Sequence, residues 1–307
     1  MNAAIRAVVR CCANFQIETR GFLHGYQGLA SGTYRDLGAR DVANILQRGG
    51  TILKTARFPE MLQPETRNQI AKRIKDLGVD ALIVIGGDGT LTGAHLLWAE
   101  HQIPYMALPG TIDNDLWGTE WTIGYDTAMN TAVSAMDKIR DTADSHDRLF
   151  VIEVMGRMSG ALAASVGLAC GAEIIFTPEG NFTLNEAVTT IQDSIKKGKK
   201  SSLVITTEGQ KPGRAYDLAD ALRKRLGIEA KVCVLGHIQR GGSPSAFDRI
   251  LASNMAAFAV DSLLAGHTDS LVGATGDKMI LLPAIDILSR RKVDPVNLVQ
   301  LAHRLSR

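Results

Sequence analysis

Short apolar runs alternate with helical apolar spacings along most of the chain. The runs predict buried parallel strands at 81–85, 104–108, 148–154, 173–177, 203–207 and 231–235. Apolar residues that recur every three or four positions predict helices at 3–12, 64–77, 91–100, 127–140, 161–169, 184–197 and 245–264. After 264 the pattern predicts a short strand, a helix following Pro283, and a basic amphipathic C-terminus. Strands that alternate with helices in this way are typical of doubly wound α/β sheets.

The region between the first two of these helices is less regular. A glycine-rich loop spans Gly25 to Gly32. A helix is expected near Asp41 to Gln47, ending at Gly49 and Gly50, with a strand pattern after it. This region therefore joins the first helix to the regular strand–helix alternation.

Length, composition and charge narrow the class of protein. A chain of 307 residues can bury a large core and predicts about two domains. With 45% hydrophobic and 21% charged residues, the composition is that of a globular protein, and no apolar run approaches the roughly 18 residues of a membrane span. The net charge of +2 is too small to argue for nucleic acid or a membrane as partner, and neither is expected. The four cysteines fit neither a disulfide framework nor a zinc site, which indicates a reducing, cytoplasmic setting.

The first stretch whose residues could carry out chemistry follows the strand at 81–85. Gly86–Thr90 reads Gly-Gly-Asp-Gly-Thr, and its glycines allow backbone N–H groups to approach a phosphate closely. Asp88 could hold Mg²⁺, and the next helix would point its positive N-terminal end at the same anion. A tight strand-to-helix turn without a ligand is the alternative interpretation. The acidic residue inside an otherwise uncharged loop favours a phosphate and metal site.

The second stretch follows the strand at 104–108. Pro109–Asp115 forms a Pro-Gly corner that carries the carboxylates of Asp113 and Asp115. Reacting groups in α/β proteins are often found at the ends of strands. Asp-rich turns are also common for local hydrogen-bonding reasons, so this stretch alone leaves both interpretations open.

Four motifs in a fixed order give the chain a family resemblance. They are Gly86–Thr90, Pro109–Asp115, Glu153–Arg157 and Gly236–Pro244. On these motifs the chain resembles the bacterial ATP-dependent 6-phosphofructokinases over nearly its whole length. The resemblance implies two Rossmann-like, doubly wound lobes with mainly parallel sheets. An ATP-binding lobe would comprise 1–124 and 239–290, and a sugar-phosphate-binding lobe 125–238 and 291–307.

The resemblance implies phosphoryl transfer from MgATP to the 1-hydroxyl of fructose 6-phosphate, a glycolytic reaction. The implied catalytic residues are Asp113 as the base, with Thr111 and Arg157. The implied substrate-binding residues are Asp115, Arg148, Met155, Gly156, Glu208, Lys231, His237 and Arg240. The implied ATP-binding residues are Arg57, Phe58, Gly87, Asp88, Gly89, Thr90 and Gly93, with Asp88 also the ligand of Mg²⁺.

The resemblance further implies a homotetramer with an effector site for ADP or phosphoenolpyruvate. The matching effector residues are Arg6, Arg10, Arg140, Glu173, Lys197 and Lys199. Taken from spacing alone, Arg6 and Arg10 fit a solvated helix face, and the lysines near 196–200 fit a helix C-terminus. The chain departs from the family pattern at Ala39 and Ser201, where the family has an arginine and a histidine, and at Lys231, where arginine is common.

Two other functions stay open at this stage. A pyrophosphate-dependent phosphotransferase of the same superfamily would carry Gly-Gly-Asp-Asp and Pro-Lys-Thr, whereas this chain has Gly89 and Gly110, which leave room for ATP. A non-catalytic sugar-phosphate or effector-binding protein is the second alternative. Its basis is that family members begin with a strand and a Gly-Gly-Asp-x-Pro-Gly loop, which would precede Met1, so the ATP lobe is expected to be incomplete at its N-terminus.

Overall fold

The computed structural model describes residues 1–146, 149–180, 182–199, 201–209, 212–292 and 295–306. The chain forms two compact units. The first comprises Met1–Thr111, Leu116–Gly124 and Ser243–Lys292, and the second Ile112–Asp115, Tyr125–Gly242 and Val293–Arg307. Relative to the boundaries expected from the sequence, 112–115 and 239–242 group with the second unit, and 291–292 group with the first.

The first unit is built on a four-stranded sheet with the order β10-β9-β4-β3. Strand β3 runs parallel to β4 and β4 parallel to β9, while β10 is antiparallel to β9. The strands of this sheet are β3 (Leu82–Gly86), β4 (Tyr105–Pro109), β9 (Ser270–Thr275) and β10 (Lys278–Pro283). The helices of this unit are α1 (Asn2–Asn14), α2 (Tyr26–Ser31), η1 (Pro59–Leu62), α3 (Pro64–Asp76), α4 (Asp88–His101), α9 (Ala246–Leu264) and α10 (Ala284–Ser289).

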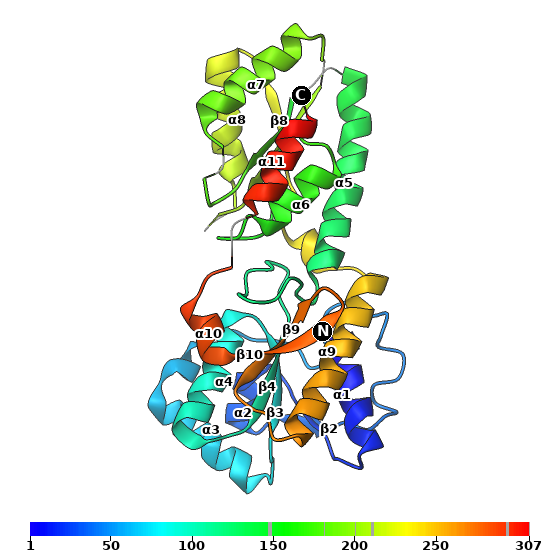
Figure 1. Ribbon diagram of the computed structural model, residues 1–307, viewed down its shortest axis with the longest axis vertical. Helices are drawn as coiled ribbons and strands as arrows, with labels where there is room; N and C mark the ends of the chain where they lie inside the picture. Colours follow the sequence, from blue (N-terminus) through cyan, green and yellow to red (C-terminus); the bar gives the residue numbers. More distant parts are fainter. Residues whose placement is uncertain (147–148, 181, 200, 210–211, 293–294, 307) are drawn as a thin grey trace. The chain divides into compact units, whose positions relative to one another are not determined.

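Helices cover both faces of this sheet, because successive side chains of a strand point to opposite faces. On β4, Tyr105 and Ala107 join the apolar cluster formed with α2, α3, α4 and α10. Met106 and Leu108 join the cluster formed with α1 and α9 on the other face. Figure 1 shows these two helical layers on either side of β4 and β9. The continuous burial of β4 confirms the strand expected at 104–108.

The second unit repeats the design with a fully parallel sheet in the order β6-β7-β5-β8. Its strands are β5 (Leu149–Val154), β6 (Ile174–Phe176), β7 (Ser202–Thr207) and β8 (Ala230–Val234). Its helices are α5 (Tyr125–His146), α6 (Ala161–Ala169), α7 (Leu184–Lys196), α8 (Arg214–Leu226), η2 (Gly236–Arg240) and α11 (Val296–Leu305). Helices α7 and α8 pack on one apolar face of the sheet, where they bury Leu149, Val151 and Val204. The expectation of an α/β fold with mainly parallel sheets is confirmed.

The expected helix near Asp41 to Gln47 is wrong. Residues 41–47 form consecutive turns, and no strand follows at 51–53. The carboxylate of Asp41 accepts a hydrogen bond from the N–H of Gly38 at 2.8 Å, and Asn44 adopts a left-handed φ of 55° that ends a helical run. Val42 and Ile45 are nevertheless buried against Ile5 and Val9 of α1, so their spacing reflects packing of a loop.

The loop expected at 25–32 also contains more structure than the sequence suggested. It holds the short helix α2, and it lies between the strands of an antiparallel hairpin, β1 (Arg20–Phe22) and β2 (Tyr34–Asp36). Glycines begin and end α2, because Gly25 and Gly32 have positive φ values of 61° and 75°.

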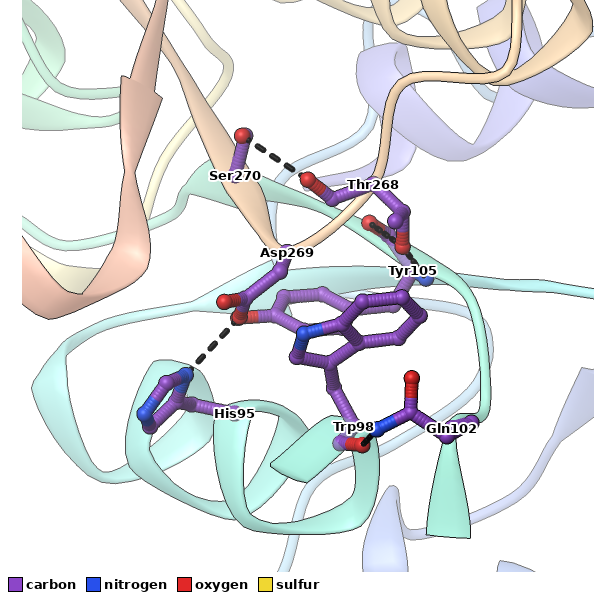
Figure 2. Close-up of polar contacts among 7 residues, drawn as sticks. All are labelled: His95, Trp98, Gln102, Tyr105, Thr268, Asp269 and Ser270. Carbon is purple, nitrogen blue, oxygen red and sulfur yellow. Dashed lines mark hydrogen bonds and ion pairs between the residues drawn. The ribbon is translucent and has the colours of Figure 1, made fainter. Parts of the chain in front are cut away.

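A polar cluster fastens α4 to the beginnings of β4 and β9 (Figure 2). Oδ1 of Asp269 accepts a hydrogen bond from the hydroxyl of Tyr105 at 2.8 Å and lies 2.8 Å from Nδ1 of His95. The hydroxyl of Thr268 accepts the backbone N–H of Tyr105 at 2.9 Å. The strands begin at this cluster, and α4 begins at the opposite, carboxyl edge of the sheet, beside Gly86 and Pro109. In the part of the chain that the structure describes, no helix has the length and apolar character needed to cross a membrane.

Candidate active site

The carboxyl ends of β3 and β4 place two loops of the first unit side by side. Gly86 lies opposite Pro109 in the parallel register, and the N–H of Gly110 donates to the carbonyl of Gly86 at 2.9 Å. A side chain at Gly110 would put its Cβ 3.0 Å from Ile85 Cγ2 and 3.2 Å from the backbone nitrogen of Gly86. The Pro-Gly corner is therefore tight, and it sets Thr111 beside Gly87.

Helix α4 begins three residues earlier than the sequence pattern suggested. Gly87 is the N-cap, so Asp88, Gly89 and Thr90 form the first turn of the helix. The carbonyl of Gly87 accepts the N–H groups of Thr90 and Leu91, whereas the first N–H groups of a helix have no partner within it. Asp88 and Gly89 are exposed, and a Cβ at Gly89 would have no atom within 4 Å. This helix start can bind an anion through backbone donors and the helix dipole.

Tyr26 of α2 is a residue of this region that sequence reasoning missed. Its hydroxyl donates to the carbonyl of Thr90 at 2.5 Å, in the first turn of α4. Burial raises the pKa of Tyr26, which keeps the hydroxyl protonated and able to donate. A tyrosine in a loop without periodicity gave no signal of this contact.

Gly93, predicted to contact ATP, is buried beneath two side chains. A Cβ there would lie 2.8 Å from Tyr26 Cε2 and 2.9 Å from Met61 Cγ, so close packing alone requires glycine. Arg57 is exposed, and Phe58 packs against the apolar cluster of α2, α3 and α4. The roles of these three residues in ATP binding stay predictions.

In the second unit the structure gathers four charged groups whose sequence positions are far apart. Asp113 is buried, and burial raises the pKa of its carboxyl group while the charges of Arg157 and Arg240 lower it. Burial also raises the pKa of Glu208, as does the charge of Asp113, and the same two arginines oppose the shift. Two acids and two guanidinium groups thus form one electrostatic cluster of Asp113, Arg157, Glu208 and Arg240.

Backbone geometry fixes the turn that carries Arg157. Gly156 has a φ of 138° and Arg157 a φ of 51°, conformations in which glycine is favoured. A Cβ at Gly156 would lie 2.6 Å from the carbonyl oxygen of Ser159 and 2.9 Å from Thr207 Cγ2. Met155 before it is buried, and Arg157 after it is exposed. The turn therefore requires glycine at 156 and presents the guanidinium at the surface of the unit.

His237 and Arg240 lie on the short helix η2, which follows β8, and both side chains are exposed. Lys231, within β8, is half-buried and forms an ion pair with Glu229 at 2.8 Å. Asp115 is exposed. Arg148 lies outside the described residues. The binding roles predicted for these residues stay predictions.

Buried hydrogen bonds also mark two residues that the sequence analysis left without a role. Glu153, 1% exposed, accepts the N–H groups of Gly213 and Ala215, each at 2.9 Å, and so joins the end of β5 to the start of α8. The side-chain oxygen of Gln239 accepts the N–H of Met155 at 2.9 Å. Both residues lie inside the motifs that carry the family resemblance, but a motif does not reveal which backbone groups its buried side chains bond.

Three of the predicted effector residues gather around residues 170–173. Arg140 donates to the carbonyls of Cys170 and Gly171 at 2.5 and 3.1 Å. The buried carboxylate of Glu173 accepts the N–H of Leu203 at 2.5 Å and pairs with Lys199. Lys197 is exposed. Arg6 and Arg10 lie on α1 in the first unit.

Known proteins resemble this chain along most of its length. The model of the family described as Phosphofructokinase matches residues 1–263. ATP-dependent 6-phosphofructokinase 1 of Thermus thermophilus is 51% identical over 292 residues, which are 95% of this chain and 91% of the relative. ATP-dependent 6-phosphofructokinase of Bacillus subtilis is 46% identical over 306 residues, covering 100% of this chain and 95% of the relative.

Solved structures show the same fold. Phosphofructokinase from Saccharomyces cerevisiae matches with a TM-score of 0.86 and 35% identity over 100% of this chain, which spans 45% of that longer chain. A pyrophosphate-dependent phosphofructokinase from Marinobacter aquaeolei matches with a TM-score of 0.85 and 21% identity, over 96% of this chain and 82% of the other, and this likeness shows the fold alone. By the match of the family model and of these relatives, the chain belongs to the phosphofructokinase family.

Proposed function

We propose that this kinase transfers the terminal phosphoryl group of ATP to the 1-hydroxyl of fructose 6-phosphate, giving fructose 1,6-bisphosphate and ADP. The observation that carries the proposal is the cluster of Asp113, Arg157, Glu208 and Arg240 in the second unit. Phosphoryl transfer needs positioned charge more than covalent chemistry, and this cluster supplies both an acid–base group and fixed cations.

Asp113 is proposed as the base that accepts the proton of the sugar hydroxyl. A carboxylate with a raised pKa is a stronger base, and the nearby charges of Arg157 and Arg240 keep its ionised form accessible. Arg157 is proposed to offset negative charge that gathers on the transferred group, and Thr111 is proposed to hold that group from the corner after β4.

The sugar phosphate is proposed to bind in the second unit. His237, Arg240, Lys231 and Arg148 would neutralise its 6-phosphate. Glu208 would bind sugar hydroxyls, Asp115 would contribute to the substrate site, and Met155 and Gly156 would line the pocket. A lysine at 231 offers a point charge without the bidentate fork of arginine.

ATP is proposed to bind in the first unit, at the start of α4. Gly87, Asp88, Gly89 and Thr90 would meet the phosphates, with Arg57, Phe58 and Gly93 nearby in the same unit. The exposed first turn and the open space at Gly89 support this assignment.

A magnesium ion fits the same helix start. Among the described residues no group of three or more His, Cys, Asp or Glu forms a self-contained metal site. A Mg²⁺ site does not need such a group, because Mg²⁺ is commonly bound by one or two carboxylates together with substrate phosphates. The exposed side chain of Asp88 could supply such a carboxylate. Bound there, the ion would neutralise phosphate charge.

Further proposals concern the regulation, assembly and location of the protein. The cluster of Arg140, Glu173 and Lys199 supports an effector site for ADP or phosphoenolpyruvate, which would also use Arg6, Arg10 and Lys197. A homotetramer is proposed from the family. The four cysteines are free thiols, which supports a reducing, cytoplasmic setting.

The test is a coupled assay for fructose 1,6-bisphosphate with either ATP or pyrophosphate as donor. We expect turnover with ATP, and with pyrophosphate a rate at least about 100-fold lower, since a difference of about 2.7 kcal/mol in transition-state binding gives that ratio. Comparable rates with ATP and pyrophosphate would favour the alternative, a pyrophosphate-dependent phosphofructokinase. Binding of fructose 6-phosphate without turnover on either donor would identify a non-catalytic binding protein.

A further inference from the structure

Gln239 is the inward-facing residue of η2, the helix that carries His237 and Arg240. It is 1% exposed, whereas the side chains of His237 and Arg240 face solvent. Its Oε1 accepts the backbone N–H of Met155 at 2.9 Å. One carboxamide therefore joins the helix proposed to bind the 6-phosphate to the turn that carries Arg157.

The sheet does not hold this turn by itself. The pairing of β5 with β7 ends at Val154 and Thr207, one residue before Met155. Gly156 and Arg157 then take left-handed conformations, and the turn closes with a bond from the N–H of Ser159 to the carbonyl of Gly156 at 2.8 Å. On the side of η2, the last backbone hydrogen bond runs from the N–H of Leu235 to the carbonyl of Glu153 at 3.0 Å. The bond from Met155 to Gln239 is thus a side-chain link beyond the paired residues of both ladders.

The other end of the Gln239 side chain indicates why the residue is present. Its Nε2 is buried and has no hydrogen-bond partner among the described residues. A buried, unpaired amide group costs free energy, and an apolar side chain would remove that cost. The same apolar side chain would leave the N–H of Met155 without its acceptor. The carboxamide is therefore explained by the hydrogen bond that it accepts from the N–H of Met155.

We propose that Gln239 is a positioning residue of the sugar-phosphate site, which fixes the spacing between His237 and Arg240 on one side and Met155 to Arg157 on the other. The proposal rests on the proposed function. It assigns no contact between Gln239 and the substrate. Loss of the bond would let the turn and η2 move independently, which weakens a site that uses both.

The experiment compares Gln239→Leu and Gln239→Met with Val204→Ala. The two apolar variants remove the acceptor with different side-chain shapes, so the test does not depend on one of them folding. Val204 is fully buried in β7 of the same unit, in the apolar cluster beneath α7 and α8, and its truncation provides a matched loss of stability. Calorimetry would measure binding of fructose 6-phosphate and of ATP, and a coupled assay would measure turnover.

We expect the Kd of fructose 6-phosphate to rise about tenfold in the Gln239 variants, the effect of one lost buried hydrogen bond, with the Kd of ATP changed less than about twofold. Hydrogen exchange at the Met155 amide should become faster in the same variants. Val204→Ala should leave both Kd values unchanged.

Three results would overturn the inference. The first is an unchanged Kd for fructose 6-phosphate in both Gln239 variants. The second is an equal loss of sugar-phosphate affinity in Val204→Ala at a similar drop in thermal midpoint, which would assign the effect to general destabilisation. The third is absence of fructose 6-phosphate binding and turnover in the unmutated protein, which would contradict the proposed function as well.

Discussion

Asp113 is a carboxylate that the fold buries next to two arginines, and its environment links catalysis to stability. Burial raises its pKa above the usual 3.8, although the charges of Arg157 and Arg240 act in the opposite direction. The folded protein therefore disfavours the ionised carboxylate relative to the unfolded chain. Stability from this group is fully present below the unfolded pKa and is lost as the pH rises through the folded pKa.

Replacement of the Asp113 carboxylate should separate its effect on catalysis from its effect on stability. In Asp113→Asn we expect kcat to fall by roughly 10²–10⁴, since a general base contributes that much. The thermal midpoint should rise above that of the unmutated protein at pH 8, and the difference should vanish below about pH 3.8, the unfolded value.

The exposed residue Asp193 on α7 provides a control, because Asp193→Asn removes a surface charge that pairs weakly with Lys196 at 3.5 Å. The kcat of Asp193→Asn should equal that of the unmutated protein. A lower thermal midpoint in Asp113→Asn at pH 8 would show that the two arginines outweigh burial at this carboxyl group.

The site residues predicted from the sequence differ in chemistry from those that the sequence did not predict. Asp113, Arg157, Glu208 and Arg240 follow strands in recognisable motifs, and the structure gathers them. Tyr26, Glu153 and Gln239 act through buried hydrogen bonds to backbone groups of other segments. Such bonds depend on which segments become neighbours, and a single sequence does not specify these pairs.

The Asp269 cluster of the first unit holds helix α4 near its middle, at His95. Tyr105 is fully buried, and burial raises the pKa of its hydroxyl, as do the hydrogen bond and the charge of Asp269, so it stays a donor. Removal of the Asp269 carboxylate would leave that donor without its acceptor and His95 without its partner. The positive φ of 51° at Asp269 is one that asparagine also tolerates.

We therefore expect Asp269→Ala to lower the free energy of unfolding by about 1–3 kcal/mol, the cost of an unpaired buried polar group. Asp269→Asn keeps an acceptor oxygen and should lose less. Urea denaturation followed by circular dichroism would measure both, with Asp277→Ala in the exposed β9–β10 turn as control. An Ala variant as stable as the Asp277 control would mean that the cluster contributes nothing to the stability of the unit.

Elements with strong patterns were predicted well, and weakly patterned ones were not. Strands β3, β4, β5 and β7 and the long helix α9 appear where the sequence predicted them. Helix α8 was missed because its buried positions are Ala215, Ala219 and Leu222, in a segment rich in charged residues. At 41–47 the apolar spacing is that of a helix, but the residues pack as turns against α1.

At the scale of the whole molecule, the chain builds each unit from separate stretches. After η2 it returns to the first unit with α9, β9, β10 and α10, and α11 then joins the second. The alternation of strands and helices predicted a doubly wound α/β fold, and the family resemblance implied two such lobes. The strand orders β10-β9-β4-β3 and β6-β7-β5-β8 depend on long-range pairing, which local patterns do not encode.

The assignment of one substrate to each unit can be tested by hydrogen exchange measured on peptides. The Asp113→Asn variant is suited to this test because slow turnover keeps both ligands intact. ATP with Mg²⁺ should slow exchange in peptides covering 86–93 of the first unit, where phosphates would use N–H groups at the start of α4. Fructose 6-phosphate should slow exchange in peptides covering 155–160 and 236–242 of the second unit, because its phosphate would order the turn and η2.

Each ligand also provides the control for the other, since the peptides of the opposite unit report any general tightening of the protein. Bound ligand stabilises the state that binds it, by about 2.7 kcal/mol at a free concentration of 100 Kd, so protection in the responding peptides should grow with ligand concentration. Protection by ATP confined to 236–242, or by fructose 6-phosphate confined to 86–93, would reverse the assignment of substrates to units. It would also remove the helix start at Asp88 as the nucleotide site, because an anion bound there cannot leave those N–H groups exchanging at their free rate.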